Sequence, residues 1–144
     1  MFETIQGEGV FTGVPSVFVR LQICPVGCAW CDTKQTWDAT PQDERPLAEV
    51  LAKTEDSPTW CSVSGDDIIE QYRQQGYQAK HIVITGGEPC IYDLRPLTEA
   101  FEAIGCRCQI ETSGTSPVLA SENTWVTVSP VSYTHLTLPT RDDV

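Results

Sequence analysis

Basic residues are scarce in this sequence: nine Lys and Arg stand against 20 Asp and Glu, a formal net charge of −11 over 144 residues. Because no cluster of Lys or Arg occurs along the chain, the composition argues against a nucleic-acid or anionic-membrane surface. No apolar run approaches the roughly 18 residues of a membrane span. Met1 is followed by an acidic segment and not by a basic one leading into an apolar run, so a soluble, unexported, cytoplasmic protein is expected.

Glycine and proline are also few, at ten each, while 40% of the residues are hydrophobic. This composition excludes collagenous, low-complexity and strongly disordered chains, and the length suits one domain. Three of the seven cysteines, Cys24, Cys28 and Cys31, lie within eight residues. In a cytosolic protein such a cluster favours a metal over disulfides.

Strands and helices are expected to alternate along most of the chain. Apolar and β-branched patterns predict strands at residues 16–22, 81–85, 106–111 and 125–128. Helices are expected at residues 46–53, from 66 or 67 to 75, and at 94–104. Asp66 or Asp67 is the expected cap of the second helix and Asp93 of the third, and Gly76 and Gly105 end them. Strands separated by helices indicate an α/β fold with a parallel sheet or barrel.

The clustered cysteines follow the first predicted strand with the spacing C-x3-C-x2-C. Three thiolates can hold a cubane of four irons and leave one iron without a protein ligand, an open position that a reactive site needs. Structural zinc would prefer a fourth Cys or His nearby, but His81 falls in a predicted buried strand. His135 falls in residues 131–144, which are expected below to be a non-native tail. The loop alone favours an open iron–sulfur cluster, with zinc and unligated thiols as alternatives.

Motifs follow the carboxyl ends of four predicted strands: residues 24–31, Thr85-Gly86-Gly87-Glu88-Pro89, Glu111-Thr112-Ser113-Gly114 and Ser129-Pro130. The carboxyl ends of parallel strands gather at one face, where β/α barrels form their active sites. Each motif alone could be turn chemistry, because loops commonly use Ser, Thr, Gly and Pro. Their coincidence at one face supports an enzyme.

The cysteine triplet is the signature of the radical S-adenosylmethionine (radical SAM) superfamily, which this sequence resembles. The segment Gly86-Gly87-Glu88-Pro89 resembles that superfamily's segment for the amino group of the cofactor, since glycine lets the backbone approach a ligand and a carboxylate suits an ammonium. Further motifs make the chain similar to the 7-carboxy-7-deazaguanine synthase family: Gln6-Gly7-Glu8-Gly9, Gly13-Val14-Pro15, Arg20, Trp30-Cys31-Asp32-Thr33 and Trp37. The resemblance covers about residues 2–130 and implies a radical SAM-type (β/α) partial barrel.

This resemblance implies a lyase that contracts 6-carboxy-5,6,7,8-tetrahydropterin to 7-carboxy-7-deazaguanine with loss of ammonia, a step toward queuosine in tRNA. The implied cofactors are a [4Fe-4S] cluster, S-adenosylmethionine and Mg²⁺, and the radical forms on the cofactor, so no protein residue is catalytic. The implied partners are the small pterin, an electron donor such as flavodoxin, and a second copy in a homodimer, with no nucleic acid and no membrane. An activase of a glycyl-radical enzyme and a non-catalytic iron–sulfur or zinc module remain alternatives.

Site residues carry over from the resemblance position by position. The implied ligands of the cluster are Cys24, Cys28 and Cys31, and the implied magnesium ligand is Thr33. Cofactor contacts are expected from Trp30, Cys31, Asp32, Gly87, Glu88, Glu111, Ser113, Ser129 and Pro130. Substrate contacts are expected from Ile5, Gln6, Gly7, Glu8, Arg20 and Thr85. An amide and a carboxylate suit an aminopyrimidinone edge, and a guanidinium suits the substrate carboxylate.

Two positions depart from the family pattern. Ile23 stands where the family commonly has Gly, so a positive φ is disfavoured there, with altered loop packing but intact ligation expected. Val131 stands where a Lys completes the family's Ser-Pro-Lys segment, and residues 131–140 resemble the translation of a sequencing adapter. We therefore expect residues 1–130 to be a truncated radical SAM core with the C-terminal part missing and residues 131–144 to be a non-native tail. The chain as printed is expected to be poorly folded or inactive.

Overall fold

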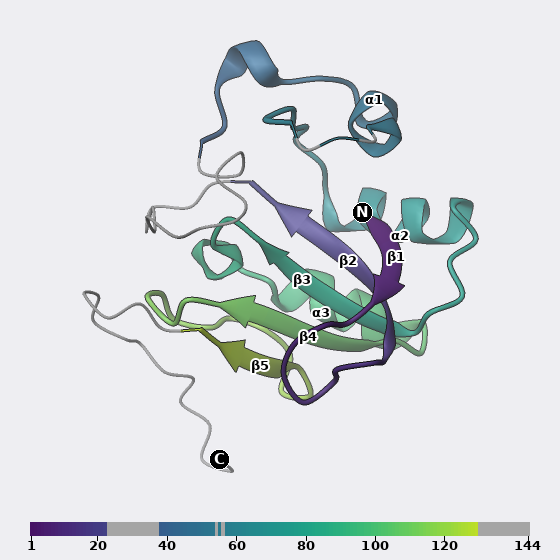
Figure 1. The fold of residues 1–144 in the computed structure, drawn as a ribbon, viewed down its shortest axis with the longest axis vertical. Coiled ribbons are helices and arrows are strands. Elements are labelled where there is room, and N and C mark those ends of the chain that lie inside the picture. Colours follow the sequence, from purple (N-terminus) through teal and green to yellow (C-terminus); the bar gives the residue numbers. More distant parts are fainter. Residues whose placement is uncertain (23–37, 54, 56, 130–144) are drawn as a thin grey trace.

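A five-stranded sheet forms the centre of the protein (Figure 1), seen in a computed structural model that describes residues 1–22, 38–53, 55 and 57–129. The strands lie side by side in chain order: β1 (Phe2–Ile5), β2 (Pro15–Leu21), β3 (His81–Gly86), β4 (Arg107–Thr112) and β5 (Trp125–Val128). β1 pairs antiparallel with β2, and the four strands from β2 to β5 are mutually parallel. The predicted α/β class and parallel sheet are therefore confirmed.

Two helices, α2 (Gly65–Gln74) and α3 (Arg95–Ala103), cover one face of the sheet and lie behind it in Figure 1. A shorter helix, α1 (Leu47–Ala52), and the 3₁₀ turn η2 (Pro41–Asp43) belong to an excursion that lies above the sheet in that view. A second 3₁₀ turn, η3 (Pro89–Ile91), follows β3. No helix in the described ranges is long and apolar enough to span a membrane.

The helix-covered face of the sheet is apolar because side chains alternate along each strand. Val17 and Val19 of β2 and Ile82 and Ile84 of β3 are buried in one cluster with residues of α2 and α3. Phe101 of α3 is fully buried in the same cluster. Burying each such side chain stabilises the fold by roughly 1.5–3 kcal/mol. This burial fixes both helices to that face and leaves the opposite face, here called the open face, for polar side chains.

The first strand was not predicted from the sequence. All four residues of β1 are exposed, so the segment carries no alternation of buried and exposed positions that a strand prediction could use. β1 is held instead by antiparallel pairing with β2, in which Phe2 lies opposite Phe18 with the ring planes 8° apart. The parallel-sheet prediction therefore missed an antiparallel edge strand.

The predicted helix caps were wrong in detail. Ser64, and neither Asp66 nor Asp67, caps α2: its hydroxyl accepts from the Asp67 N–H at 3.1 Å. The Asp67 carboxylate in turn accepts from the Ser64 N–H at 2.8 Å, which completes a capping box. At α3 the N-cap residue is Leu94, and Asp93 accepts from the Arg95 N–H at 3.1 Å from one residue earlier.

Candidate functional site at the carboxyl edge of the sheet

The parallel strands bring the predicted motifs to one edge of the sheet. Arg20 of β2 lies opposite Thr85 of β3, and Glu111 of β4 lies opposite Thr127 of β5. Each of these strands ends within a few residues of those positions, so residues 85–89, 111–114 and 129 lie at or just after neighbouring strand ends. Just beyond Val128, the Ser129 N–H donates to the Thr112 carbonyl at 2.9 Å.

Gly86 allows the ends of β2 and β3 to approach closely. Its φ is +149°, and a Cβ there would lie 2.1 Å from the Leu21 carbonyl oxygen, so no other residue fits without a backbone shift. The Gly87 N–H then donates to the same Leu21 carbonyl at 3.1 Å. The Gly-Gly pair therefore has a structural cause at its first position, and its second position begins the turn toward Glu88.

Glu88 is almost completely buried, with 1% of its surface exposed. Its carboxylate accepts from the Cys90 N–H at 2.9 Å, from the Thr112 hydroxyl at 2.8 Å and from the Ser113 N–H at 2.8 Å. The Ser113 hydroxyl also donates to it. These bonds join η3 to the end of β4 and engage both carboxylate oxygens within the protein.

A chain of hydrogen-bonded polar side chains, here called the open-face chain, runs along the open face from the start of β3 to the carboxyl edge of the sheet. His81 Nε2 lies 2.8 Å from Gln109 Oε1, and Gln6 Nε2 lies 3.2 Å from the same oxygen. Gln6 Nε2 also donates to Glu111 Oε1 at 2.8 Å, and the Thr85 hydroxyl donates to Glu111 Oε2 at 3.3 Å. Both carboxylate oxygens of Glu111 are thus held by protein donors.

The loop of residues 6–14 crosses in front of the sheet in Figure 1. It places Gln6 on the open face, within hydrogen-bond distance of Gln109 and Glu111. The Gln6 N–H donates to the Val14 carbonyl at 2.9 Å, and the Gly13 N–H donates to the Gln6 carbonyl at 2.7 Å. The ring of Phe11 in this loop packs 4.4 Å from that of His81. Gln6 itself is only 2% exposed.

The remaining predicted substrate residues are accessible. Arg20 is exposed on the open face of β2, and Ile5 has 55% of its surface exposed at the end of β1. Gly7 and Glu8 are exposed in the loop that follows. The structure therefore places Arg20 and Thr85 on paired strands, while it separates the buried Gln6 from its exposed neighbours.

The cysteines outside the cluster behave as buried or half-buried thiols. Burial raises the pKa of Cys90 to about 11 and that of Cys108 to about 12, and desolvation also raises the pKa of the half-buried Cys61. These thiols stay protonated near neutral pH. Among the described residues there is also no group of three or more His, Cys, Asp or Glu side chains that could hold a metal.

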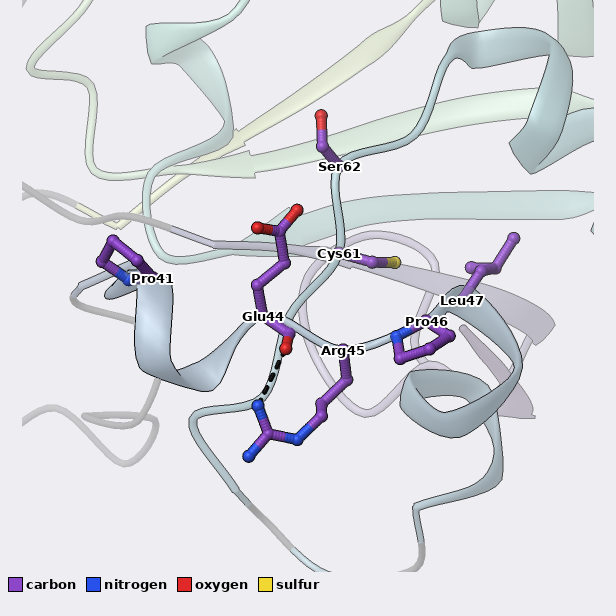
Figure 2. A pocket seen from close by; sticks show the side chains of 7 residues that line it. All are labelled: Pro41, Glu44, Arg45, Pro46, Leu47, Cys61 and Ser62. Carbon is purple, nitrogen blue, oxygen red and sulfur yellow. Dashed lines mark hydrogen bonds between the residues drawn. The ribbon is translucent and has the colours of Figure 1, made fainter.

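A hollow of about 500 Å³ lies in the excursion and is shown in Figure 2. Its lining consists of Pro41, Glu44, Arg45, Pro46, Leu47, Cys61 and Ser62. The Arg45 guanidinium donates to the Glu44 carbonyl at 2.8 Å there. None of the predicted site residues lines this hollow.

Several predicted site residues lie outside the described residues: Cys24, Cys28, Trp30, Cys31, Asp32, Thr33 and Pro130. Among the described residues, the sequence did not predict that Gln109, Thr127 and His81 take part in the open-face chain. Gln109 Nε2 donates to the Thr127 hydroxyl at 2.9 Å. The available signal was the alternation of polar residues at positions 107, 109 and 111 with apolar ones between them, which puts Gln109 on the same face as Glu111.

The parallel sheet, the helices on one face and the motifs at its carboxyl edge define part of a radical SAM partial barrel. The fold matches the crystal structure of QueE from Escherichia coli with a TM-score of 0.91 and 57% identity, covering 93% of this chain and 59% of that chain. Over about nine tenths of its length the chain is similar to the 7-carboxy-7-deazaguanine synthases.

The 7-carboxy-7-deazaguanine synthase of Escherichia coli (strain K12) is 59% identical over 130 residues, which cover 90% of this chain and 58% of the relative. The synthase of Buchnera aphidicola subsp. Schizaphis graminum is 48% identical over 130 residues, covering 90% of this chain and 59% of that relative. No protein-family model matches the chain. The chain thus spans somewhat more than half the length of the curated relatives it matches.

Proposed function

We propose that the whole protein is a 7-carboxy-7-deazaguanine synthase. It would act as a radical SAM carbon–nitrogen lyase that converts 6-carboxy-5,6,7,8-tetrahydropterin to 7-carboxy-7-deazaguanine and ammonia in queuosine biosynthesis. The observation that carries this proposal is the 59% identity over 130 residues to a synthase of that name. The gathering of the motifs at one edge of the sheet supports it, because ligands of parallel α/β sheets bind at the carboxyl ends of the strands.

The donor set suits the implied cofactors. Cys24, Cys28 and Cys31 would hold the [4Fe-4S] cluster, and Thr33 would provide one ligand to Mg²⁺, which takes its other ligands from substrate and water. When bound, the cluster and S-adenosylmethionine supply the carbon radical that takes a hydrogen atom from the substrate. The proposed contacts to S-adenosylmethionine are Trp30, Cys31, Asp32, Gly87, Glu88, Glu111, Ser113, Ser129 and Pro130.

The fit can be tested on the described members of this set. The half-buried Glu111 carboxylate suits the cofactor's ammonium, and the exposed Ser129 suits its polar groups. Glu88 would contribute differently, because its carboxylate is spent on Cys90, Thr112 and Ser113. We propose that Glu88 serves the cofactor by holding the Ser113 segment at the edge.

Two residues of the sheet and the loop of residues 5–8 would bind and orient the pterin. The exposed Arg20 guanidinium would pair with the substrate carboxylate. Thr85 lies on the neighbouring strand opposite Arg20, and its hydroxyl is already directed at Glu111 by a 3.3 Å hydrogen bond. The loop of residues 5–8 would cover the substrate and exclude water from this end of the open face.

The proposal also includes an electron donor such as flavodoxin, a homodimer and a cytoplasmic location. The acidic composition, with a net charge of −11, supports a small-molecule substrate over direct binding of tRNA, since nucleic-acid binding depends on Lys and Arg at phosphates. The pterin would therefore be acted on before its product is built into RNA.

The test is anaerobic reconstitution with iron and sulfide, followed by metal analysis and detection of 5′-deoxyadenosine. Two proteins are compared: the chain as printed, and the continued chain, in which residues 1–130 are joined to the C-terminal part of the Escherichia coli relative in place of residues 131–144. We expect the continued chain to hold iron and to cleave S-adenosylmethionine when the carboxypterin is present, and Cys28→Ala to do neither. Zinc in place of iron would establish a zinc module, and cleavage that ignores the pterin would favour an activase.

A further inference from the structure

His81 has no part in the proposed reaction, yet it is 6% exposed at the start of β3 and joined to the site by the open-face chain. Its Nε2 lies 2.8 Å from Gln109 Oε1, and its ring is fixed by Phe11 at 4.4 Å. A buried imidazole held on both sides in this way has one orientation.

The hydrogen bonds of the chain have one consistent direction. Gln6 Nε2 faces the Glu111 carboxylate, which only accepts, and Gln6 Oε1 faces the Glu8 N–H at 3.2 Å, which only donates. The second hydrogen on Gln6 Nε2 therefore points at Gln109 Oε1. Because that amide oxygen is an acceptor, the hydrogen between Gln109 and His81 belongs to His81 Nε2.

This direction leaves the Gln6 amide without a hydrogen for the substrate. One of its two N–H groups is directed at Gln109 and the other at Glu111. If the Gln109 amide were reversed, its NH₂ would face the NH₂ of Gln6 at 3.2 Å, donor against donor. That clash of donors excludes the reversal, and the His81 N–H, which also donates to Gln109 Oε1, holds the Gln109 amide in the same orientation.

We propose that His81 is a positioning residue for the substrate site: through Gln109 it fixes the Gln6 amide, which in turn orients the Glu111 carboxylate. Gln6 and Thr85 each occupy one oxygen of Glu111. The remaining lone pairs are thereby aimed at a ligand that carries N–H donors, as an aminopyrimidinone or an ammonium does. The assignment of that ligand rests on the proposed function, whereas the direction of the chain does not.

The first test measures the order of the open-face hydrogen-bond chain without turnover, on the continued chain used in the reconstitution assay. Exchange of the Gln6 side-chain amide hydrogens with solvent is followed by ¹H–¹⁵N NMR. His81→Phe keeps the ring against Phe11 but removes the donor, and it is expected to speed this exchange about tenfold, as loss of one hydrogen bond predicts. His81→Gln restores an N–H donor and should return the rate to within about threefold of the parent.

The matched control is Val83→Ala, a fully buried position on the same strand and face with no hydrogen bond in the chain. It disturbs packing alone, so the Gln6 exchange rate should stay near that of the parent. If His81→Phe does not fold, Gln109→Met breaks the chain one link nearer the site and must produce the same acceleration. An unchanged Gln6 rate in whichever of these two variants folds overturns the proposal.

The second test separates positioning from the proposed function. His81→Phe is expected to raise KM for S-adenosylmethionine several-fold, because Glu111 is the proposed contact to its ammonium, and also KM for the carboxypterin, which binds beside Gln6 and Thr85. The effect on kcat should be smaller, and His81→Gln should restore both KM values. Equal loss in kcat at unchanged KM would contradict a positioning part in substrate binding. If the parent protein does not turn over the pterin, the proposed function fails, while the exchange measurement still decides whether His81 orders the chain.

Discussion

Replacing Glu88 by Gln keeps the shape of the side chain but removes one acceptor. Glu88 Oε1 accepts from the Ser113 N–H at 2.8 Å and Oε2 accepts from the Cys90 N–H at 2.9 Å. A Gln side chain must turn its NH₂ toward one of these backbone donors, whichever way it is oriented. The substitution therefore places donor against donor at a position that is 1% exposed.

The magnitude follows from those contacts. A hydrogen bond to a charged group contributes about 1.5–3 kcal/mol, and an unsatisfied buried donor costs about 1–3 kcal/mol. Because the two effects share one contact, we expect Glu88→Gln to lower the free energy of unfolding by about 2–4 kcal/mol. Urea unfolding followed by tryptophan fluorescence measures the change.

Glu122→Gln is the matched control, because Glu122 is exposed and the same change there should alter the free energy of unfolding by less than about 0.5 kcal/mol. A Glu88→Gln protein as stable as this control would refute the reasoning. That result would show that the Glu88 carboxylate does not hold the end of β4.

Three further predictions concern stability and reactivity. Gly86→Ala places a Cβ 2.1 Å from the Leu21 carbonyl oxygen and should destabilise the fold by more than about 2 kcal/mol, measured by the same unfolding assay; a neutral result would contradict the close approach of β2 and β3. Hydrogen bonds from Ser64 lower the pKa of Asp67, so its stabilisation is complete above the ordinary value of 3.8 and is lost as the pH falls below it. The stability difference between the parent and Asp67→Asn should therefore be present near neutral pH and vanish in acid, and a difference that persists there would count against the capping box. Cys90, whose pKa is raised to about 11, should resist alkylation at neutral pH more than the half-buried Cys61, as peptide mass spectrometry can show; equal labelling would contradict its burial.

Much of the parallel sheet could be predicted because its strands are continuous apolar runs or clean alternations ending in Gly, Ser or Pro. Residues 81–85 are the clearest case, since an apolar run stops at a Gly-Gly pair. β1 could not be predicted in this way, because its pairing with β2 stabilises it and its own residues are exposed. A strand of that kind is specified by its partner and not by its own pattern.

The candidate site could be predicted as far as the motifs at the strand ends. Thr85, Glu111 and Ser129 were expected at one edge, and parallel pairing brings their strands together. The sequence could not show that Glu88 faces Thr112 and Ser113, because side chains 24 and 25 residues apart meet only once the strands pair. For the same reason the sequence could not show the direction of the hydrogen bonds that pass through Gln109 in the open-face chain.

We propose that this edge of the sheet is the substrate and cofactor site of a 7-carboxy-7-deazaguanine synthase. The most direct test is to incubate the reconstituted, continued chain with 6-carboxy-5,6,7,8-tetrahydropterin, S-adenosylmethionine and a reductant, and to identify the products by mass spectrometry. We expect 7-carboxy-7-deazaguanine with one ammonia released per molecule, no product from Cys28→Ala, and a raised KM for the pterin in Arg20→Ala. A protein that holds the iron–sulfur cluster and cleaves S-adenosylmethionine but leaves the carboxypterin unchanged would contradict it.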